Sequence, residues 1–247
     1  LFLGTIGAAL FFTGLTSAFL YLMIDSAQGN SDRGRQVSRE VLQLAGGSAY
    51  AFASVGGLLG IIALCVFAAQ TAQEYTYGTL RNLLVRQPGR VRILIGKFAA
   101  MKIFALILVA IAATVSISLS YYLSDRAKVS TALWFTSDGY HAIGQTLLNV
   151  TISVIYFGII GMVLGLLLRS PISAISIGVL WILIIENLLG AVKPVLLEWM
   201  PGNQFSTIAQ GGSTTISYSH ALTLGSIYVL VGAVLATVLF SRRDVGN

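Results

Sequence analysis

Charged residues are scarce in this sequence. Only 10% of the 247 residues are Asp, Glu, Lys or Arg, whereas soluble domains carry about 25%. Hydrophobic residues make up 56% of the chain, and a water-soluble fold of this length cannot hide so much apolar surface. We therefore expect an integral membrane protein.

The residues that build disulfides and metal sites are also few. Cys65 is the single cysteine, so the chain cannot form an internal disulfide. The two histidines, His141 and His220, are far apart in the sequence, and Asp138 is the carboxylate beside the first of them. We expect solvated loop histidines and no bound metal. The apolar segments contain no Ser/His/Asp or paired-carboxylate arrangement, which argues against an intramembrane enzyme.

A nucleotide-binding loop is missing as well. A P-loop needs the pattern G-x-x-x-x-G-K-[ST], in which backbone amides hold the phosphates and the hydroxyl binds magnesium. The nearest match, GRVRILIGKF, has six residues between its glycines and Phe98 in place of the hydroxyl residue. We predict that this chain is not an enzyme and holds no cofactor.

The apolar residues are gathered into six long segments. A helix that crosses the hydrocarbon core needs about 20 such residues, and the alternation expected of barrel strands is absent. The sequence therefore predicts an all-α integral membrane protein, a single domain over 1–247. The chain begins with Leu1 inside the first apolar segment, and we expect a preceding segment to be missing. The six predicted spans are about 1–24, 49–69, 93–123, 146–168, 171–191 and 219–240.

Basic residues are concentrated on one side of this layout. The loop 70–92, the turn at Arg169 and the C-terminal tail, with Lys97 and Lys102, hold nine basic and two acidic residues, a net charge of +7. The other side holds six basic and seven acidic residues, a net charge of −1. Lys and Arg accumulate in cytoplasmic loops. We therefore predict a multi-pass protein of the plasma (inner) membrane with both termini in the cytoplasm, and we interpret the net charge of +6 as orientation charge rather than as a nucleic-acid site.

The basic loop contains a predicted amphipathic helix. Residues 78–87 read as a short helix that Pro88 ends. Tyr77, Leu80 and Leu84 fall on one face of that helix, and Thr79 and Arg86 fall on the other. The helix either rests on anionic lipid as an anchor or presents a face to a soluble partner.

Several motifs in and around this loop resemble those of ABC-2 type transporter permeases. They are Glu74, the Gly78-Thr79-Leu80 run, Pro88 with Arg90, and Gly96-Lys97, together with the ending LFSRRDVGN. The resemblance also covers the six-span layout. It implies a cytoplasmic coupling helix that docks on ATPase subunits, formed by Glu74, Tyr77, Gly78, Thr79, Leu80, Arg81, Leu84, Arg86, Pro88 and Arg90.

The same resemblance implies the partners and the activity. The chain would be the transmembrane subunit of an exporter, with ATP and Mg bound by separate ABC ATPase subunits. A second permease subunit, identical or paralogous, would enclose the translocation path with it. The apolar helices carry scattered Thr, Ser, Asn and Tyr, which suit drugs, peptides or lipids alike.

The region after the fifth span is too polar to cross the membrane and too apolar for an ordinary loop. Pro194, Pro201 and Gly202 break it into two short pieces. It resembles the outer re-entrant helical hairpin between the fifth and sixth spans of ABC-2 permeases; the alternative is an interfacial loop with Trp199 as a belt residue.

Glu186 is about fifteen residues into the fifth span, at a depth where a carboxylate is costly. Either the span ends early and Glu186 begins the outer loop, or Glu186 and Asn187 turn inward as an outer gate. Lys193 is a potential ion-pair partner of Glu186 if the helix continues. The candidate gate is Glu186, Asn187, Lys193 and Trp199.

Two other function classes remain open. A secondary transporter driven by an ion gradient predicts inverted repeats and charged, broken helices in mid-membrane, which the sequence does not display. A non-transporting membrane scaffold or immunity protein is the third possibility. An ABC ATPase gene beside this one would distinguish the first reading from the other two.

Overall fold

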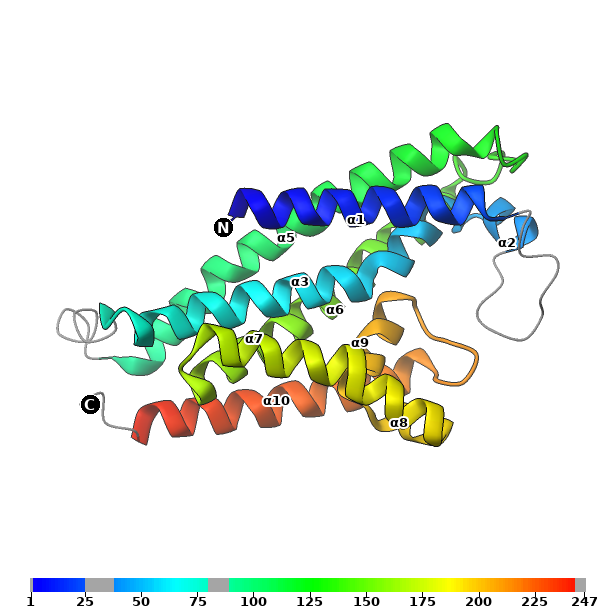
Figure 1. The fold of residues 1–247 in the computed structure, drawn as a ribbon. Helices are drawn as coiled ribbons and strands as arrows, with labels where there is room; N and C mark the ends of the chain where they lie inside the picture. Colours follow the sequence, from blue (N-terminus) through cyan, green and yellow to red (C-terminus); the bar gives the residue numbers. More distant parts are fainter. Residues whose placement is uncertain (1, 25–37, 80–88, 243–247) are drawn as a thin grey trace.

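The computed structural model describes residues 2–24, 38–79 and 89–242, and the described residues form helices joined by short connections (Figure 1). No strand occurs among them. The elements are α1 (Phe2–Leu22), α2 (Arg39–Gln43), α3 (Gly47–Thr76), α5 (Arg90–Ser124), α6 (Ser137–Leu168), α7 (Pro171–Leu180), the π-helical turn η2 (Trp181–Ile185), α8 (Glu186–Val192), the 3-10 helix η3 (Pro194–Trp199), α9 (Pro201–Ala209) and α10 (Tyr218–Arg242).

Six of these helical stretches are long and apolar enough to cross a membrane, as the sequence predicts. The fifth is the continuous run of α7, η2 and α8. α3 and α6 are longer than the predicted spans 49–69 and 146–168, because polar turns continue both helices: Gln70–Thr76 at the end of α3, and residues 137–145 at the start of α6. The chain is therefore a multi-pass helical membrane protein.

The helices run alternately from one end of the bundle to the other. α3 and α6 end, and α5 and α7 begin, at the left of Figure 1. Lys97 and Arg169, two of the basic residues predicted to be cytoplasmic, lie toward this end, and we call it the inner end; the opposite end is the outer end. Arg169, with φ of 55°, terminates α6 in the left-handed conformation, and Ser170 caps α7 with its side chain ahead of Pro171.

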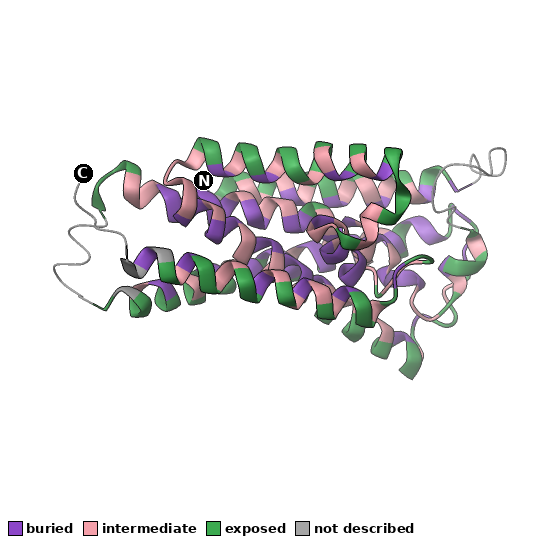
Figure 2. Ribbon diagram, turned by 90° about the horizontal axis from the view of Figure 1, so that it is seen from below, coloured by how far each residue is buried: buried purple, intermediate pink, exposed green. Residues whose placement is uncertain are grey.

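The core of the bundle is the packing of α3 against α6. Figure 2 shows the buried residues concentrated at the centre of the bundle and the exposed ones on its periphery. Of the apolar stretch of α3, 61% is buried, compared with 17% for α1 and 17% for the α7–α8 run. Phe67 and Phe157 are among the largest fully buried side chains at the centre. The helices at the periphery of the bundle therefore present their apolar surface to the bilayer.

α1 and α5 form a second layer on α3. Their contact carries buried hydroxyls, including Ser17 and Ser116, whose Oγ atoms are 2.9 Å apart and hydrogen-bonded. At the outer end, the Trp134 indole donates a hydrogen bond of 2.8 Å to the Leu42 carbonyl oxygen and ties the segment after α5 to α2. Small hydroxyl residues of this kind let membrane helices approach closely and bond across the contact.

The segment after α8 folds back into the bundle. η3 packs against α8, and α9 then lies against α3, α6 and α10. Phe205 and Ile208 of α9 are fully buried, and Phe205 makes an edge-to-face contact with Phe157 of α6. Two short helical pieces, η3 and α9, therefore lie between the fifth and sixth spans, and the re-entrant placement of this hairpin in the membrane stays a prediction.

Candidate functional sites at the two ends of the bundle

At the inner end, α3 stops at a glycine that the turn requires. Gly78 has φ of +65°, the left-handed region that side-chain-bearing residues rarely adopt. The amide of Tyr77 donates to the Gln73 carbonyl oxygen at 2.9 Å, and the amide of Gly78 donates to Tyr75 at 3.3 Å. The predicted Gly78-Thr79 motif thus begins with a helix C-terminal turn.

An ion pair joins the two helices on either side of the basic loop. The Lys97 Nζ of α5 lies 2.8 Å from the Glu74 carboxylate of α3 and donates a second hydrogen bond, of 3.1 Å, to the Gln70 carbonyl oxygen. Both side chains are largely shielded, with 15% of Lys97 and 28% of Glu74 exposed. The ion pair thus gives Glu74 a partner 23 positions further along the chain.

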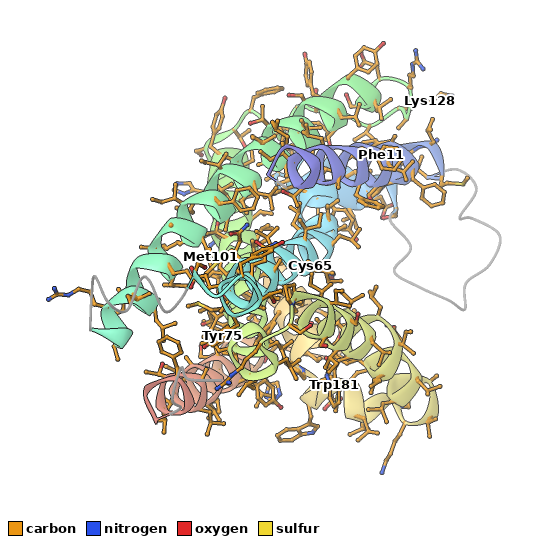
Figure 3. All side chains as sticks on the ribbon, turned by 60° about the vertical axis from the view of Figure 1, so that its left-hand side comes forward. Phe11, Cys65, Tyr75, Met101, Lys128 and Trp181 are labelled. Carbon is orange, nitrogen blue, oxygen red and sulfur yellow. The ribbon has the colours of Figure 1, made fainter. Side chains whose placement is uncertain are left out.

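A second basic residue, Arg169, contacts the same end of α3. Arg169, between α6 and α7, places its guanidinium 5.4 Å from the centre of the Tyr75 ring, the geometry of a cation–π contact. Figure 3 brings this end of the bundle forward and labels Tyr75. The end of α3 therefore contacts α5 through Lys97 and the α6–α7 turn through Arg169.

The structure describes some of the remaining predicted coupling residues but not others. Tyr77 and Thr79 are exposed, and Arg90 is the first residue of α5. Leu80, Arg81, Leu84, Arg86 and Pro88 lie outside the described residues, so the helix predicted over 78–87 stays a prediction.

At the outer end, Glu186 is buried and hydrogen-bonded. Only 3% of the residue is exposed. Its Oε1 accepts from the Gly202 amide and its Oε2 from the Asn203 amide, each at 2.9 Å. These are the second and third residues of α9, whose first residue is Pro201 and whose cap position, Met200, offers no side-chain acceptor. Glu186 therefore caps the N-terminus of another helix, where a negative charge is favoured.

The approach of Glu186 to α9 depends on a missing side chain. A Cβ at residue 202 would lie 2.8 and 3.0 Å from the two Glu186 oxygens and 3.0 Å from a methyl carbon of Ile182. Glycine at residue 202 thus leaves room for the carboxylate, which a side chain there would displace. The π-helical turn η2 directly precedes Glu186, whose own amide bonds to the Trp181 carbonyl oxygen; such turns are frequent at functional positions.

The other three predicted gate residues do not join Glu186. α8 ends at Val192, and Lys193 is extended and exposed, so the conditional Glu186–Lys193 ion pair is not formed. The Asn187 side chain is exposed and donates to the Leu183 carbonyl oxygen at 3.0 Å. Trp199 is 54% exposed, and its carbonyl oxygen accepts a hydrogen bond of 2.6 Å from Tyr228 of α10.

Sequence reasoning did not find Gly202 and Asn203 as the hydrogen-bond partners of Glu186. The Pro-Gly pair at 201–202 indicates a break between helices. It is also typical of a helix start, where proline has no amide hydrogen to donate and the next amides need an acceptor from elsewhere in the fold. Because Pro201 and Gly202 were interpreted only as residues that end a helix, the start of α9 was not predicted. Over the described ranges, no group of three His, Cys, Asp or Glu residues is placed to hold a metal ion.

Comparison with known proteins adds a family. The chain is similar to the uncharacterized protein YhcI of Bacillus subtilis (strain 168), with 21% identity over 207 residues. That match covers 77% of this chain and 66% of YhcI, so the chain spans slightly less than two thirds of that relative's length. A family model described as protein of unknown function (DUF2705) matches residues 14–246. Since the match includes all but the first helical turns and the last residue, the chain belongs to the DUF2705 family.

Proposed function

We propose that this chain is the transmembrane subunit of an ABC-2 type exporter, coupled to separate ATPase subunits and paired with a second permease subunit. The observation that carries the proposal is the Glu74–Lys97 ion pair. It joins two residues of the motifs that resemble the ABC-2 coupling loop, and it holds the end of α3 to the start of α5 on either side of that loop.

This arrangement suits the transmission of a movement. The segment between Thr79 and Gly89 is attached to α3 and α5, and Lys97 binds both the Glu74 carboxylate and the Gln70 backbone. α3 in turn packs along the length of α6. A displacement of the loop by an ATPase would therefore move α3 and α5 together and reach α6 at the centre of the bundle.

At the outer end, the hairpin of η3 and α9 would close the path. Its attachment to the fifth span is the pair of hydrogen bonds from α9 to Glu186. Breaking these two bonds would free the N-terminus of α9 without unfolding a spanning helix. We propose Glu186 as the residue that holds this outer gate shut.

A secondary transporter is the second candidate, because Glu186 is a buried carboxylate within a spanning segment, the kind of residue that carries protons in such transporters. The two classes differ in their energy source. Transport by an ABC exporter stops without ATP, and transport by a secondary carrier stops when an ionophore collapses the ion gradient.

The test begins with the neighbouring genes, where the proposal expects one that encodes an ABC ATPase. That ATPase is then co-expressed with this chain, and the complex is purified in nanodiscs. We expect the ATPase to co-purify with the wild-type chain. Leu80→Asp and Leu84→Asp should reduce co-purification at least about tenfold, because helix-in-groove contacts depend on a few apolar anchors. Val195→Asp, at an exposed position of the outer end, is the matched control and should bind as the wild type does.

Normal co-purification and normal transport by both loop variants would contradict the coupling role of the loop. Absence of binding between the wild-type chain and the neighbouring ATPase, with the chain folded and monodisperse, would contradict the exporter proposal itself.

A further inference from the structure

A groove on the side of the bundle has no role in the proposed function. It is a cavity of about 230 Å³ between α5, α6 and α10. Ile95 and Phe98 of α5 form one wall, Ala233 and Thr237 of α10 form the other, and Val163 of α6 lies between them. α5 and α10 contact each other only over a short stretch, so α6 forms the floor.

The lining of the groove is almost entirely hydrocarbon. Thr237 is the one polar residue of the lining, and its hydroxyl already donates a hydrogen bond of 2.7 Å to the Ala233 carbonyl oxygen of its own helix. Among the residues that the structure describes, no titratable side chain lines the groove. A bound group must therefore be apolar, since a polar group would lose its hydrogen bonds to water and find no partner here.

The groove has a buried floor and an exposed rim. Leu166 and Ala236 are 7% and 2% exposed, whereas Val91 and Ile95 on the rim are 47% and 63% exposed. All three helices are membrane-spanning, so the opening faces the acyl chains of the surrounding bilayer. The volume is below the roughly 300–1,000 Å³ of pockets for drug-sized ligands, which favours part of a flexible chain as the occupant.

A basic residue lies beside the inner-end rim of the groove. Arg92, an exposed residue of the first turn of α5, follows the rim residue Val91. The nearest carboxylate along α3, that of Glu74, is already paired with Lys97. Basic groups at a membrane surface attract anionic headgroups.

We propose that this groove binds one acyl chain of an anionic phospholipid, with the headgroup at Arg92. The apolar lining favours an acyl chain, the opening toward the bilayer admits it, and the Arg92 guanidinium favours an anionic headgroup. The proposal is independent of the exporter function, because it needs neither an ATPase nor a second permease subunit.

The test is native mass spectrometry of protein taken from nanodiscs made of equal parts phosphatidylglycerol and phosphatidylcholine. The wild-type chain should keep one phosphatidylglycerol after detergent release. Ala233→Phe, which fills the groove, should lower the retained fraction at least about fivefold. Val234→Phe adds the same ring on the neighbouring exposed position of α10 and should retain lipid as the wild type does. Arg92→Gln should lose the preference for phosphatidylglycerol by about fivefold while still holding a lipid.

Equal retention by the wild type and Ala233→Phe would overturn the assignment of the groove. Equal retention of the two lipids by the wild type would overturn the assignment of the headgroup. If Ala233→Phe is not monodisperse, Ile95→Asp applies the same test from the exposed rim, where a carboxylate repels the acyl chain without crowding the core.

Discussion

Two carboxylates within the long helices of this protein are stabilised in different ways. Glu74, near the inner end, is neutralised by the Lys97 ammonium. Glu186, deep in the fifth span, receives two backbone amides and the positive end of α9. An unpaired charge in this environment is costly. Each carboxylate therefore holds a second element in place: α5 beside Glu74, and α9 beside Glu186.

The capping of α9 by Glu186 can be tested with three variants. Glu186→Ala and Gly202→Ala should each lower the free energy of unfolding by about 1–3 kcal/mol. The first removes the acceptor of the two α9 amides, and the second adds a Cβ that pushes the carboxylate away from them. Glu186→Gln should cost less, since its amide oxygen still accepts one hydrogen bond. Thermal unfolding in detergent measures the differences, and Lys193→Ala, at an exposed position without an ion pair to Glu186, should match the wild type.

A loss in Lys193→Ala equal to that in Glu186→Ala would show that the lysine, not α9, satisfies the carboxylate. The gate requires more than stability. Full transport by Glu186→Ala at unchanged expression would contradict the gating role of Glu186 and leave it as a purely structural cap.

At the scale of elements, the closeness of α3 and α6 depends on glycine. A Cβ at Gly161 of α6 would meet the backbone carbonyl oxygen and Cα of Leu64 in α3, well inside van der Waals contact. Main chain cannot move aside as a flexible side chain can. The two central helices therefore approach each other as membrane helices with small interface residues do.

Gly161→Ala should destabilise the bundle by about 1–3 kcal/mol, the range for an overpacked core. Gly144→Ala, on the exposed surface of the same helix with no atom within 4 Å of the added Cβ, is the matched control. That change should be neutral or stabilising by up to about 1 kcal/mol, because alanine is the better helix former. Thermal unfolding of the two purified variants makes the comparison, and similar losses would contradict the close α3–α6 contact.

At the scale of the whole molecule, the charge distribution predicts the orientation. With Cys65→Ser as a cysteine-free background, cysteines at Asn30 and at the exposed Ser130 should react with a membrane-impermeant maleimide in intact cells. Cysteines at Pro88 and Asn247 should react only after permeabilisation, because Lys and Arg keep their loops in the cytoplasm.

Labelling of the Pro88 cysteine in intact cells would reverse the orientation and remove the loop from reach of a cytoplasmic ATPase. Permeabilised cells provide the control, since all four cysteines should then react.

The sequence by itself determined the class and layout of this protein. The number of spanning helices follows from local composition, because about 20 consecutive apolar residues leave water for a bilayer whatever their neighbours are. The helix boundaries near Arg169–Pro171 also follow locally, from Ser170 and Pro171 at the start of α7. The coupling helix over 78–87 rests on the same kind of local pattern and stays a prediction.

Tertiary structure alone decided the partners. Local pattern pointed Glu186 toward Lys193, seven residues ahead on the same helix, but its bonds go to amides 16 and 17 residues away. That choice depends on how η3 and α9 fold back over the bundle, and no window of sequence contains that geometry. The lipid-facing groove is likewise made by three helices that are far apart along the chain. Partition into a membrane is a property of each segment, whereas hydrogen-bond partners and grooves are properties of which segments pack together.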